Sequence, residues 1–259
     1  MFVLLWMFVQ VIAESLPISS SGHVTLLHQL LDMHCDSTVT MLIQFLLHVP
    51  ALLILLIYFF KSWWNLVFAS KSITHVFKVT LFVVVADLVT ILFWYIDLAH
   101  VPIIEQCFLP VGFCLTMVCL YITRYYNQNK ILQWSVHDGM ILGIVQGLSL
   151  LPGISRFAST YSAGLLLGYS RWHSFCISFL IQIPLLCAAI LKSFLVLYHH
   201  PDYVYNFLNV TMIFSLVLAT LFSYIIFSGV GILIEKNKIW YFSLYMIIPI
   251  SLSLWLCKG

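Results

Sequence analysis

A carboxylate, a run of hydroxyls and an imidazole lie close together near the start of the chain. Gln10 and Glu14 are spaced i, i+4 and therefore share one face of a helix, which Pro17 breaks. The residues after the break include Ser19, Ser20, Ser21, Gly22 and His23. A hydroxyl is a poor nucleophile unless a base or a metal ion activates it, so Glu14 and His23 beside Ser20 indicate nucleophilic or acid–base catalysis.

A second polar cluster surrounds an arginine in the middle of the chain. Pro152 and Gly153 end one helix. Ser155 and Arg156 then begin the next helix, with Thr160 one turn further on. The unpaired amides and the dipole at a helix N-terminus favour an anion, and a guanidinium matches phosphate oxygens in a bidentate fork. The pattern predicts a phosphate site where the two clusters meet.

The composition places both clusters in a membrane protein. Of 259 residues, 63% are hydrophobic and 8% are charged, and the mean hydropathy is +1.06. Soluble domains carry about 25% charged residues, so a water-solvated surface cannot be built from this sequence. The net charge of +2, without a stripe of Lys and Arg, argues against a nucleic-acid partner.

Six apolar runs are long enough to cross a hydrocarbon core of ~30 Å. They lie at about 41–60, 79–97, 103–123, 174–198, 208–230 and 238–257. The segments 1–31 and 137–168 are each broken by Pro, Gly and hydroxyl residues, and we expect them to form re-entrant helix-loop-helix hairpins. The predicted fold is an all-α polytopic membrane domain with six transmembrane helices plus two re-entrant hairpins, whose halves, 1–125 and 130–259, are inverted-topology repeats.

Basic residues indicate the orientation of this topology. One side of the membrane receives Lys61, Lys71, Lys78, Arg124, Lys130, Arg171, Lys236 and Lys238. Lys258 lies on the opposite side. Because cytoplasmic loops are enriched in Lys and Arg, both termini are predicted to lie outside, and the first hairpin is expected to open outward.

Each polar residue also has a structural interpretation. Glu14 could lie at the membrane interface, hydrogen-bonded to its own loop, and serine hydroxyls commonly cap helices. Arg156 could extend to lipid headgroups or form a structural ion pair with Glu14. An isolated His23 is more often a hydrogen-bonded structural residue than a catalytic one. A carboxylate inside a membrane costs at least ~2.5 kcal/mol, however, and the gathering of these residue types favours a catalytic site.

Both clusters resemble the signatures of the undecaprenyl-diphosphatase family, the membrane phosphatases of the bacitracin-resistance type. The first family signature, (E/Q)xxxE followed by LPxSSSGH, is matched from Gln10 to Glu14 and from Leu16 to His23. The second, PGxSRSGxT, is matched at Pro152, Gly153, Ser155, Arg156 and Thr160. Weaker similarity, for example at His48, extends the resemblance over most of the chain. The family fold has the same six crossings and two hairpins.

The resemblance implies a function and its setting. Family members hydrolyse undecaprenyl diphosphate to undecaprenyl phosphate and phosphate, which recycles the carrier lipid for cell-wall synthesis and confers bacitracin resistance. The expected partner is therefore a polyprenyl diphosphate lipid, in the bacterial inner (cytoplasmic) membrane. A divalent cation, Mg²⁺ or Ca²⁺, is the expected cofactor, and a homodimer is left open.

Roles can be assigned to the matched positions as hypotheses. The expected catalytic residues are Glu14, Ser20, His23 and Arg156. Ser20 would be the nucleophile and His23 its proton-transfer partner, although a directly attacking water remains an alternative. The expected phosphate-binding residues are Ser19, Ser21, Ser155, Arg156 and Thr160. Gln10 and Glu14 would hold the metal ion, and Glu14 could alternatively act as a base.

The sequence departs from the family pattern at a few positions. Phe157 and Ala158 replace the usual Ser-Gly, and Val11 stands where Gly usually follows the first motif residue. Met246 replaces an Arg that often follows Tyr245 in the family. The expected catalytic residues are intact. Phe157 is expected to narrow or tilt the second loop, which would affect the level of activity.

Two other functions compete with this one. Type-2 phosphatidic-acid phosphatases share SGH and SR dipeptides, but their Ser-Arg-x5-His-x3-Asp signature would need a histidine where this chain has Ser162. A non-enzymatic lipid-phosphate transporter or flippase would suit broken helices and inverted repeats equally well. A transporter needs an anion site but has no use for a nucleophile and a base, so the gathered Glu, Ser, His and Arg favour the phosphatase.

Overall fold

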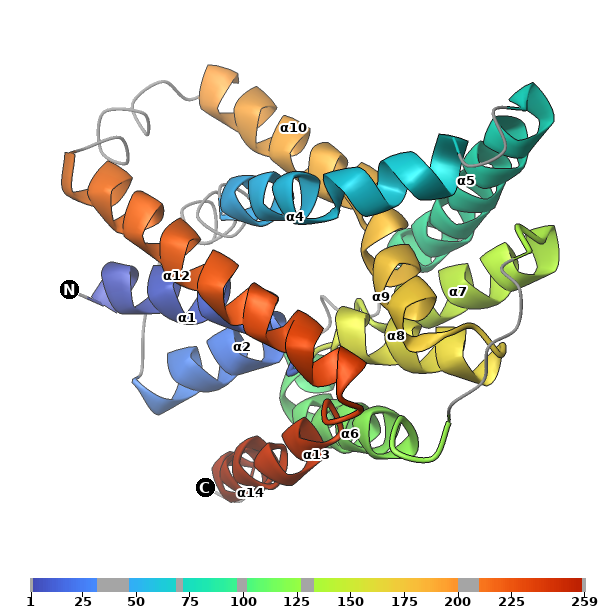
Figure 1. The fold of residues 1–259 in the computed structure, drawn as a ribbon. Coiled ribbons are helices and arrows are strands. Elements are labelled where there is room, and N and C mark those ends of the chain that lie inside the picture. The colour runs from blue at the N-terminus through green and yellow to red at the C-terminus, as the bar shows by residue number, and fades with distance from the viewer. Residues whose placement is uncertain are drawn as a thin grey trace.

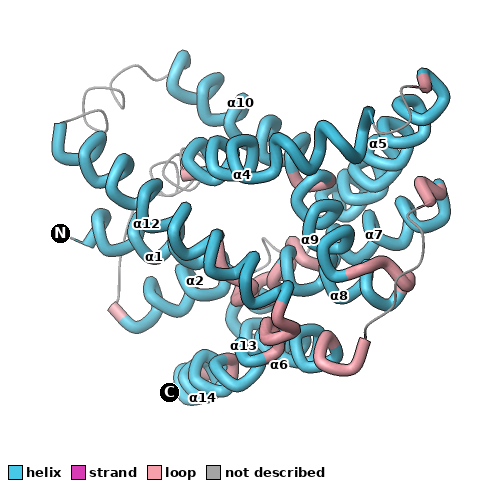
Figure 2. Tube along the Cα trace, viewed as in Figure 1, coloured by secondary structure: helices cyan, strands magenta, loops and turns pink. Residues whose placement is uncertain are grey.

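The protein is helical throughout the part of the chain that the structure describes. A computed structural model describes residues 2–31, 47–68, 72–96, 102–126, 133–199 and 210–257. Helices joined by short turns fill these ranges, and no strand occurs within them (Figures 1 and 2). The predicted all-α class is therefore confirmed for the described residues.

The first broken segment folds as two helices joined by a tight turn. They are α1 (Phe2–Glu14) and α2 (Ser20–Leu30), which lie side by side at the left of Figure 1. Pro17 lies in the turn, where its missing amide costs no helical hydrogen bond. Ser19 has a left-handed φ of 69° and accepts a hydrogen bond from the Gly22 amide. This cap begins α2 directly after the turn, so that the run of hydroxyls follows closely on the glutamate.

The second broken segment has the same helix-turn-helix form. It consists of α7 (Val136–Leu148) and α8 (Arg156–Leu166). Gly153 turns the chain with a φ of 83°, a conformation that costs glycine little. Ser155 then caps α8 by accepting a hydrogen bond from the Ala158 amide at 3.2 Å. The expected helix start at Arg156 is therefore confirmed.

Further helices follow each hairpin. Those after the first are α4 (His48–Phe68), α5 (Ile73–Ile96) and α6 (Pro102–Ile122), and those after the second are α9 (Arg171–Leu180), α10 (Ile183–His199), α12 (Val210–Glu235), α13 (Tyr241–Tyr245) and α14 (Ile247–Leu256). In the described ranges, four helical stretches are long and apolar enough to cross a membrane. They are His48–Phe68, Ile73–Tyr95, Arg171–His199 and Leu216–Glu235. The chain is thus a multi-pass membrane protein, and the count of six crossings stays a prediction.

Two predicted spans contain breaks that the hydropathy pattern does not reveal. Ile181 and Gln182 form a turn between α9 and α10, and Met246 separates α13 from α14. Each break comes just before a proline, Pro184 in the first case and Pro249 in the second. A proline ring clashes with the preceding turn and cannot donate a hydrogen bond to it, which interrupts the helix there.

The first predicted span has different bounds in the structure. It was expected over 41–60, but α4 continues through Lys61 to Phe68. Trp63 is buried, and its indole N–H donates a hydrogen bond to the Cys176 carbonyl at 3.0 Å. Lys61 lies on the exposed face, so a single charge there does not end the helix. Residues 41–46 lie outside the described residues.

A cluster of phenylalanines holds several of these helices together. Phe59 contacts Phe175 with ring centroids 4.9 Å apart. Phe179 contacts Phe157 at 4.7 Å and Phe227 at 5.0 Å. The rings come from α4, α8, α9 and α12, so this cluster fixes the second hairpin against three other helices.

The tight packing of α5 on α7 depends on a row of glycines. Gly139, Gly143 and Gly147 are spaced four residues apart and share one face of α7. A Cβ atom at Gly143 would lie 2.5 Å from the Ala86 carbonyl oxygen, so only glycine allows this approach. Thr90 of α5 donates a hydrogen bond to the Gly143 carbonyl at 3.2 Å. Small residues bring helices together in this way in membranes.

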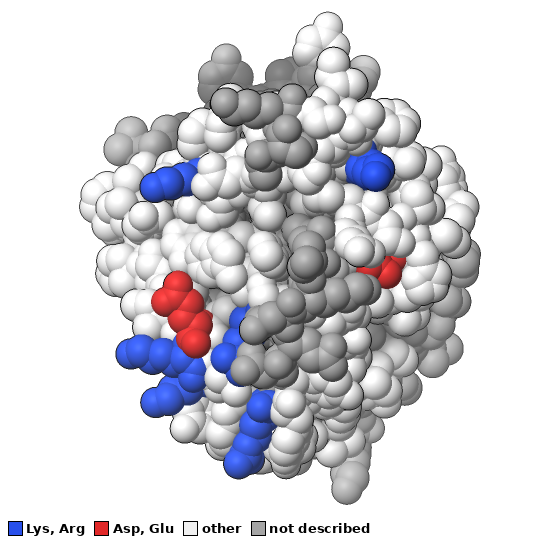
Figure 3. Space-filling view, turned by 45° about the vertical axis from the view of Figure 1, so that its right-hand side comes forward, with Lys and Arg blue, Asp and Glu red and all other residues white. Residues whose placement is uncertain are grey.

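The outer surface suits a lipid environment. Figure 3 shows a face that is mostly uncharged, with Lys and Arg gathered mainly toward its lower end. Large apolar side chains are exposed on the outer surface, such as Ile57 and Phe60 on α4, which are 68% and 65% exposed. The division into halves 1–125 and 130–259 stays a prediction.

Candidate active site

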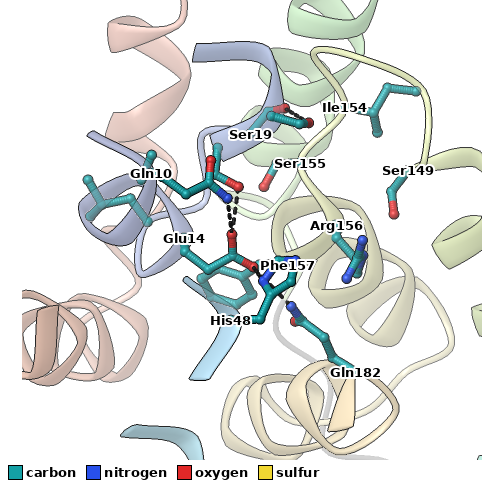
Figure 4. A pocket seen from close by; sticks show the side chains of 14 residues that line it. Gln10, Glu14, Ser19, His48, Ser149, Ile154, Ser155, Arg156, Phe157 and Gln182 are labelled. Carbon is teal, nitrogen blue, oxygen red and sulfur yellow. Dashed lines mark hydrogen bonds and ion pairs between the residues drawn. The ribbon is translucent and has the colours of Figure 1, made fainter. Parts of the chain in front are cut away.

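A polar cavity of about 150 Å³ lies where the two hairpin turns meet (Figure 4). Its wall consists of Gln10, Ala13, Glu14, Leu16, Ser19, Ser20, Ser21, His48, Ser149, Ile154, Ser155, Arg156, Phe157 and Gln182. Both hairpins, α4 and the turn between α9 and α10 contribute to it. The two polar segments therefore line one cavity, as predicted, and the roles of their residues stay predictions.

Glycines allow the two turns to approach. A Cβ atom at Gly22 would lie 2.8 Å from Gly153 Cα and equally close to the Phe113 ring. A Cβ atom at Gly112 of α6 would lie 3.0 Å from the same Gly153 Cα. Because backbone meets backbone here, the hydroxyls of the first turn reach the helix start of the second.

Glu14 is the centre of the polar contacts in the cavity. The Ser20 hydroxyl donates a hydrogen bond to Glu14 Oε2 at 2.8 Å, and Gln10 Nε2 donates to the same oxygen at 3.2 Å. Gln182 Nε2 donates to Glu14 Oε1 at 3.4 Å, and His48 Nδ1 lies 3.9 Å from that oxygen. A carboxylate that accepts a hydrogen bond from a hydroxyl is placed to take its proton.

The N-terminus of α8 faces the same cavity. Thr116 of α6 accepts a hydrogen bond from the Ser155 amide at 2.8 Å and donates to the Gly153 carbonyl at 2.8 Å, which fixes the turn. The next two amides, of Arg156 and Phe157, make no hydrogen bond within the described part of the chain. Both residues line the cavity, so their amides can donate hydrogen bonds to a bound anion.

Arg156 supplies the positive charge of the site. Within the described residues its guanidinium makes no ion pair, and its buried Nε has no hydrogen-bond partner. Its charge interacts electrostatically with the carboxylates of Glu14 and Asp87. In Figure 4, Glu14 and Arg156 lie on opposite sides of His48 in the view shown. A buried cation without a direct partner is costly, so an anion such as a phosphate is a fitting ligand.

Two of the predicted site residues do not line the cavity. His23 Nδ1 donates a hydrogen bond to the Ser19 carbonyl at 2.8 Å, and in the neutral ring Nε2 accepts one from the Tyr245 hydroxyl at 2.9 Å. Its ring stacks on Tyr245 at 5.8 Å between centroids. Thr160 donates to the Arg156 carbonyl at 2.8 Å. Both side chains contact the backbone of site residues instead of the cavity.

The cavity wall also contains residues that the sequence interpretation had not assigned to the site. In the sequence, His48 is only a position of weaker family similarity. Gln182 lies within the predicted apolar span 174–198. The signal that could have found Gln182 is its position: an uncharged polar residue inside an apolar run, just before Pro184. Phe157 lines the cavity while packing against the phenylalanine cluster.

The oxygen atoms of the cavity suit a hard divalent cation. Gln10 Oε1 is buried and has no hydrogen-bond partner among the described residues, and it lies one helical turn before the Glu14 carboxylate. Within the described residues no group of three or more His, Cys, Asp or Glu side chains is gathered for a metal. Mg²⁺ commonly takes one or two protein oxygens and completes its shell with water and substrate phosphate, so the two residues fit such an ion.

Comparison with known proteins identifies the family. The family described as Bacitracin resistance protein BacA matches residues 3–250. The undecaprenyl-diphosphatase of Borrelia hermsii (strain HS1 / DAH) is 29% identical over 260 residues, which cover 95% of this chain and 94% of the relative. The undecaprenyl-diphosphatase of Elusimicrobium minutum (strain Pei191) is 32% identical over 71% of this chain and 72% of its own. Because the family match spans nearly the whole sequence, the chain belongs to the BacA family of bacitracin resistance proteins.

Proposed function

We propose that this protein is an integral membrane phosphatase that hydrolyses undecaprenyl diphosphate to undecaprenyl phosphate and inorganic phosphate. This reaction recycles the carrier lipid for cell-wall synthesis. One observation carries the proposal: the Ser20 hydroxyl donates a 2.8 Å hydrogen bond to Glu14 in a cavity that also contains the Arg156 guanidinium. A nucleophile, a base and an anion-binding group are the parts that transfer of a phosphoryl group requires.

Arg156 binds the terminal phosphate in this mechanism. Its guanidinium and the free amides of Arg156 and Phe157 contact the equatorial oxygens of the phosphoryl group. The Ser19 and Ser155 hydroxyls complete the phosphate-binding site. These groups stabilise the negative charge that is spread over the phosphoryl oxygens in the transition state.

Ser20 attacks the bound phosphoryl group. As its Oγ forms a bond to the terminal phosphorus, Glu14 takes the hydroxyl proton, and the bond from phosphorus to the bridging oxygen breaks with undecaprenyl phosphate as the leaving group. Water then hydrolyses the phosphoserine and releases inorganic phosphate. In the alternative route, Glu14 directs a water molecule to the phosphorus without a covalent intermediate. This route uses the same phosphate-binding site.

Gln10 and Glu14 are the proposed ligands of a Mg²⁺ or Ca²⁺ ion. When bound, such an ion neutralises phosphate charge and helps to orient the diphosphate. The support is the buried Gln10 Oε1, which lies next to the Glu14 carboxylate; this Gln10 oxygen accepts no hydrogen bond from the part of the chain that the structure describes. The identity of the ion and its requirement stay predictions.

In this proposal, His23 has an indirect role: it supports the turn at Ser19. Its hydrogen bond to the Ser19 carbonyl supports the left-handed turn that presents the hydroxyls, and the Tyr245 hydroxyl holds its other nitrogen. Strained backbone of this kind persists where the surroundings hold it, often at functional sites. Proton transfer by His23, the role expected from its position in the motif, would require the ring to turn away from Tyr245.

We further propose the complete topology: six crossings plus two re-entrant hairpins in the bacterial inner membrane, with both termini outside. Support comes from the two helix-turn-helix segments, each followed by further apolar helices, and from the distribution of basic residues in the sequence. The two halves, 1–125 and 130–259, are proposed to be inverted repeats. A homodimer stays a prediction.

The deciding experiment measures phosphate release from undecaprenyl diphosphate by the detergent-purified protein, with and without Mg²⁺ or Ca²⁺. Release that Glu14→Ala abolishes would support both the activity and the site. No release with either ion, from protein that remains monodisperse and thermally stable, would contradict the phosphatase and leave the lipid-phosphate transporter as the alternative. Among the observations on this chain, none favours the transporter.

A further inference from the structure

An amide side chain in the cavity wall takes no part in the mechanism above. Gln182 is 5% exposed and lies within Arg171–His199, one of the stretches long enough to cross a membrane. It lines the polar cavity and also a smaller, mostly apolar pocket beside it, whose wall includes Ile54 and Phe179. A buried amide is costly unless it is hydrogen-bonded, so the partner of Gln182 indicates what the residue does.

A break in the membrane-spanning stretch brings Gln182 to the cavity. α9 ends at Leu180 and α10 begins at Ile183, so Gln182 lies in the turn between them. Its backbone amide donates a hydrogen bond to the Phe179 carbonyl at 3.1 Å, and its carbonyl accepts one from the Leu186 amide at 3.0 Å. The backbone of Gln182 is thus hydrogen-bonded on both sides of the break, and the side chain starts from a fixed position.

The second hairpin holds the same turn. Gln146, near the C-terminal end of α7, is fully buried, and its Nε2 donates a hydrogen bond to the Ile181 carbonyl at 3.3 Å. The last carbonyls of a helix have no partner within it, and this hydrogen bond satisfies one of them at the end of α9. The position of Gln182 therefore depends on the hairpin that also carries Arg156.

The two oxygens of Glu14 are held from different sides. Ser20 and Gln10, both of the first hairpin, donate to Oε2 at 2.8 and 3.2 Å. Gln182 Nε2 donates to Oε1 at 3.4 Å, and Figure 4 shows its amide pointing toward Glu14 from the side opposite to Gln10. His48 Nδ1 lies further away, 3.9 Å from Oε1. The last torsion of a glutamate has only a broad preference, so these hydrogen bonds decide which oxygen faces Ser20.

We infer that Gln182 is a positioning residue for Glu14: its amide holds Oε1 and thereby keeps Oε2 directed at the Ser20 hydroxyl. Ser20 gives its proton to Oε2 as its oxygen attacks the phosphorus, so a carboxylate that rotates freely is less often in place to accept that proton. Gln182 itself takes no proton and acts through Glu14. This inference rests on the proposed function, because it assigns Glu14 the role of base.

The first measurement compares the kinetics of Gln182→Met with those of the wild-type protein. Methionine matches the length of glutamine but has no N–H group to donate. We expect kcat for phosphate release to fall by about tenfold, the order of one lost hydrogen bond to a charged group. KM for undecaprenyl diphosphate should stay near the wild-type value, because the lost contact acts in the chemical step.

Ser193→Ala is the matched control. The Ser193 hydroxyl is buried in the same membrane-spanning stretch and, among the described residues, donates only to the Ala189 carbonyl of its own helix at 3.0 Å. This variant also removes a buried hydrogen bond, but one outside the cavity wall, so both kcat and KM should equal the wild-type values.

Infrared spectroscopy measures the contact without any turnover. The carboxylate stretching band of Glu14 is identified by its loss in Glu14→Gln. A hydrogen bond to a carboxylate oxygen changes the frequency of this band, whereas a residue that only supports the fold leaves it in place. The band should therefore shift in Gln182→Met and stay at the wild-type frequency in Ser193→Ala.

The two measurements together decide the inference. A lower kcat with unchanged KM and a shifted Glu14 band supports the positioning role. An unchanged kcat, or a band that does not move, overturns it. Gln182→Leu, which also lacks a donor, replaces the methionine variant if that variant does not fold. A wild-type protein that releases no phosphate would contradict the phosphatase itself, and the infrared band would still decide whether Gln182 holds the carboxylate.

Discussion

At the scale of single residues, the hydrogen bond between Ser20 and Glu14 makes the clearest prediction. Ser20→Ala removes the nucleophile, and kcat for phosphate release should fall by about 10³-fold or more, as for other nucleophile deletions. Ser251→Ala is the control, since Ser251 is exposed on α14 and, among the described residues, its hydroxyl bonds only to the Ile247 carbonyl of its own helix. Near-normal turnover by Ser20→Ala would instead identify water as the attacking group.

Arg156 gives a second prediction at this scale. Arg156→Lys keeps the positive charge but removes the paired N–H donors of the guanidinium and its Nε. We therefore expect kcat to fall by about 10²- to 10³-fold, which is the cost of losing a donor to a developing oxyanion. Arg124→Lys is the matched control, because Arg124 is exposed and packs over the Trp240 ring 4.6 Å away. A lysine variant that keeps full activity would show that the positive charge alone suffices and that the bidentate geometry of the guanidinium has no role.

At the scale of elements, the glycine row of α7 decides how closely α5 approaches. In Gly143→Leu the new Cβ would lie 2.5 Å from the Ala86 carbonyl oxygen, so the helices must separate. We expect a loss of roughly 1–3 kcal/mol in stability, seen as a lower unfolding temperature in detergent. Gly229→Ala on α12 is the control: no atom of the described residues lies within 4 Å of its Cβ position, and alanine favours a helix by up to ~1 kcal/mol. Equal unfolding temperatures for the two variants would mean that this approach is not essential.

At the scale of the whole molecule, the orientation in the membrane can be tested with thiol labelling. Cys257 is exposed after the last helix and is predicted to lie outside. A variant that retains only Cys257 should react with a membrane-impermeant reagent in intact cells. The single cysteine of Lys236→Cys, in the exposed turn after α12, should react only after permeabilisation. The reverse pattern would invert the proposed topology.

Much of this protein follows from the sequence by local physics. Composition alone determines the membrane class, because so few charges cannot cover a water-exposed surface. The spacing of Gln10 and Glu14 places both on one helix face, and the structure confirms a hydrogen bond between them at 3.2 Å. Pro152 and Gly153 likewise determine that a helix begins at Arg156. These features depend only on neighbours along the chain, and the sequence therefore specifies them.

Only the tertiary structure decided which faces meet. His48 and Gln182 enter the cavity and His23 turns toward Tyr245, because helix packing selects partners that no local pattern encodes. Asp87 of α5 accepts a hydrogen bond from Gln146 of α7 only because glycines of α7 let the two helices approach each other. Periodicity tells which residues share a face of one helix, whereas the partner of that face depends on the shape of every other element in the fold.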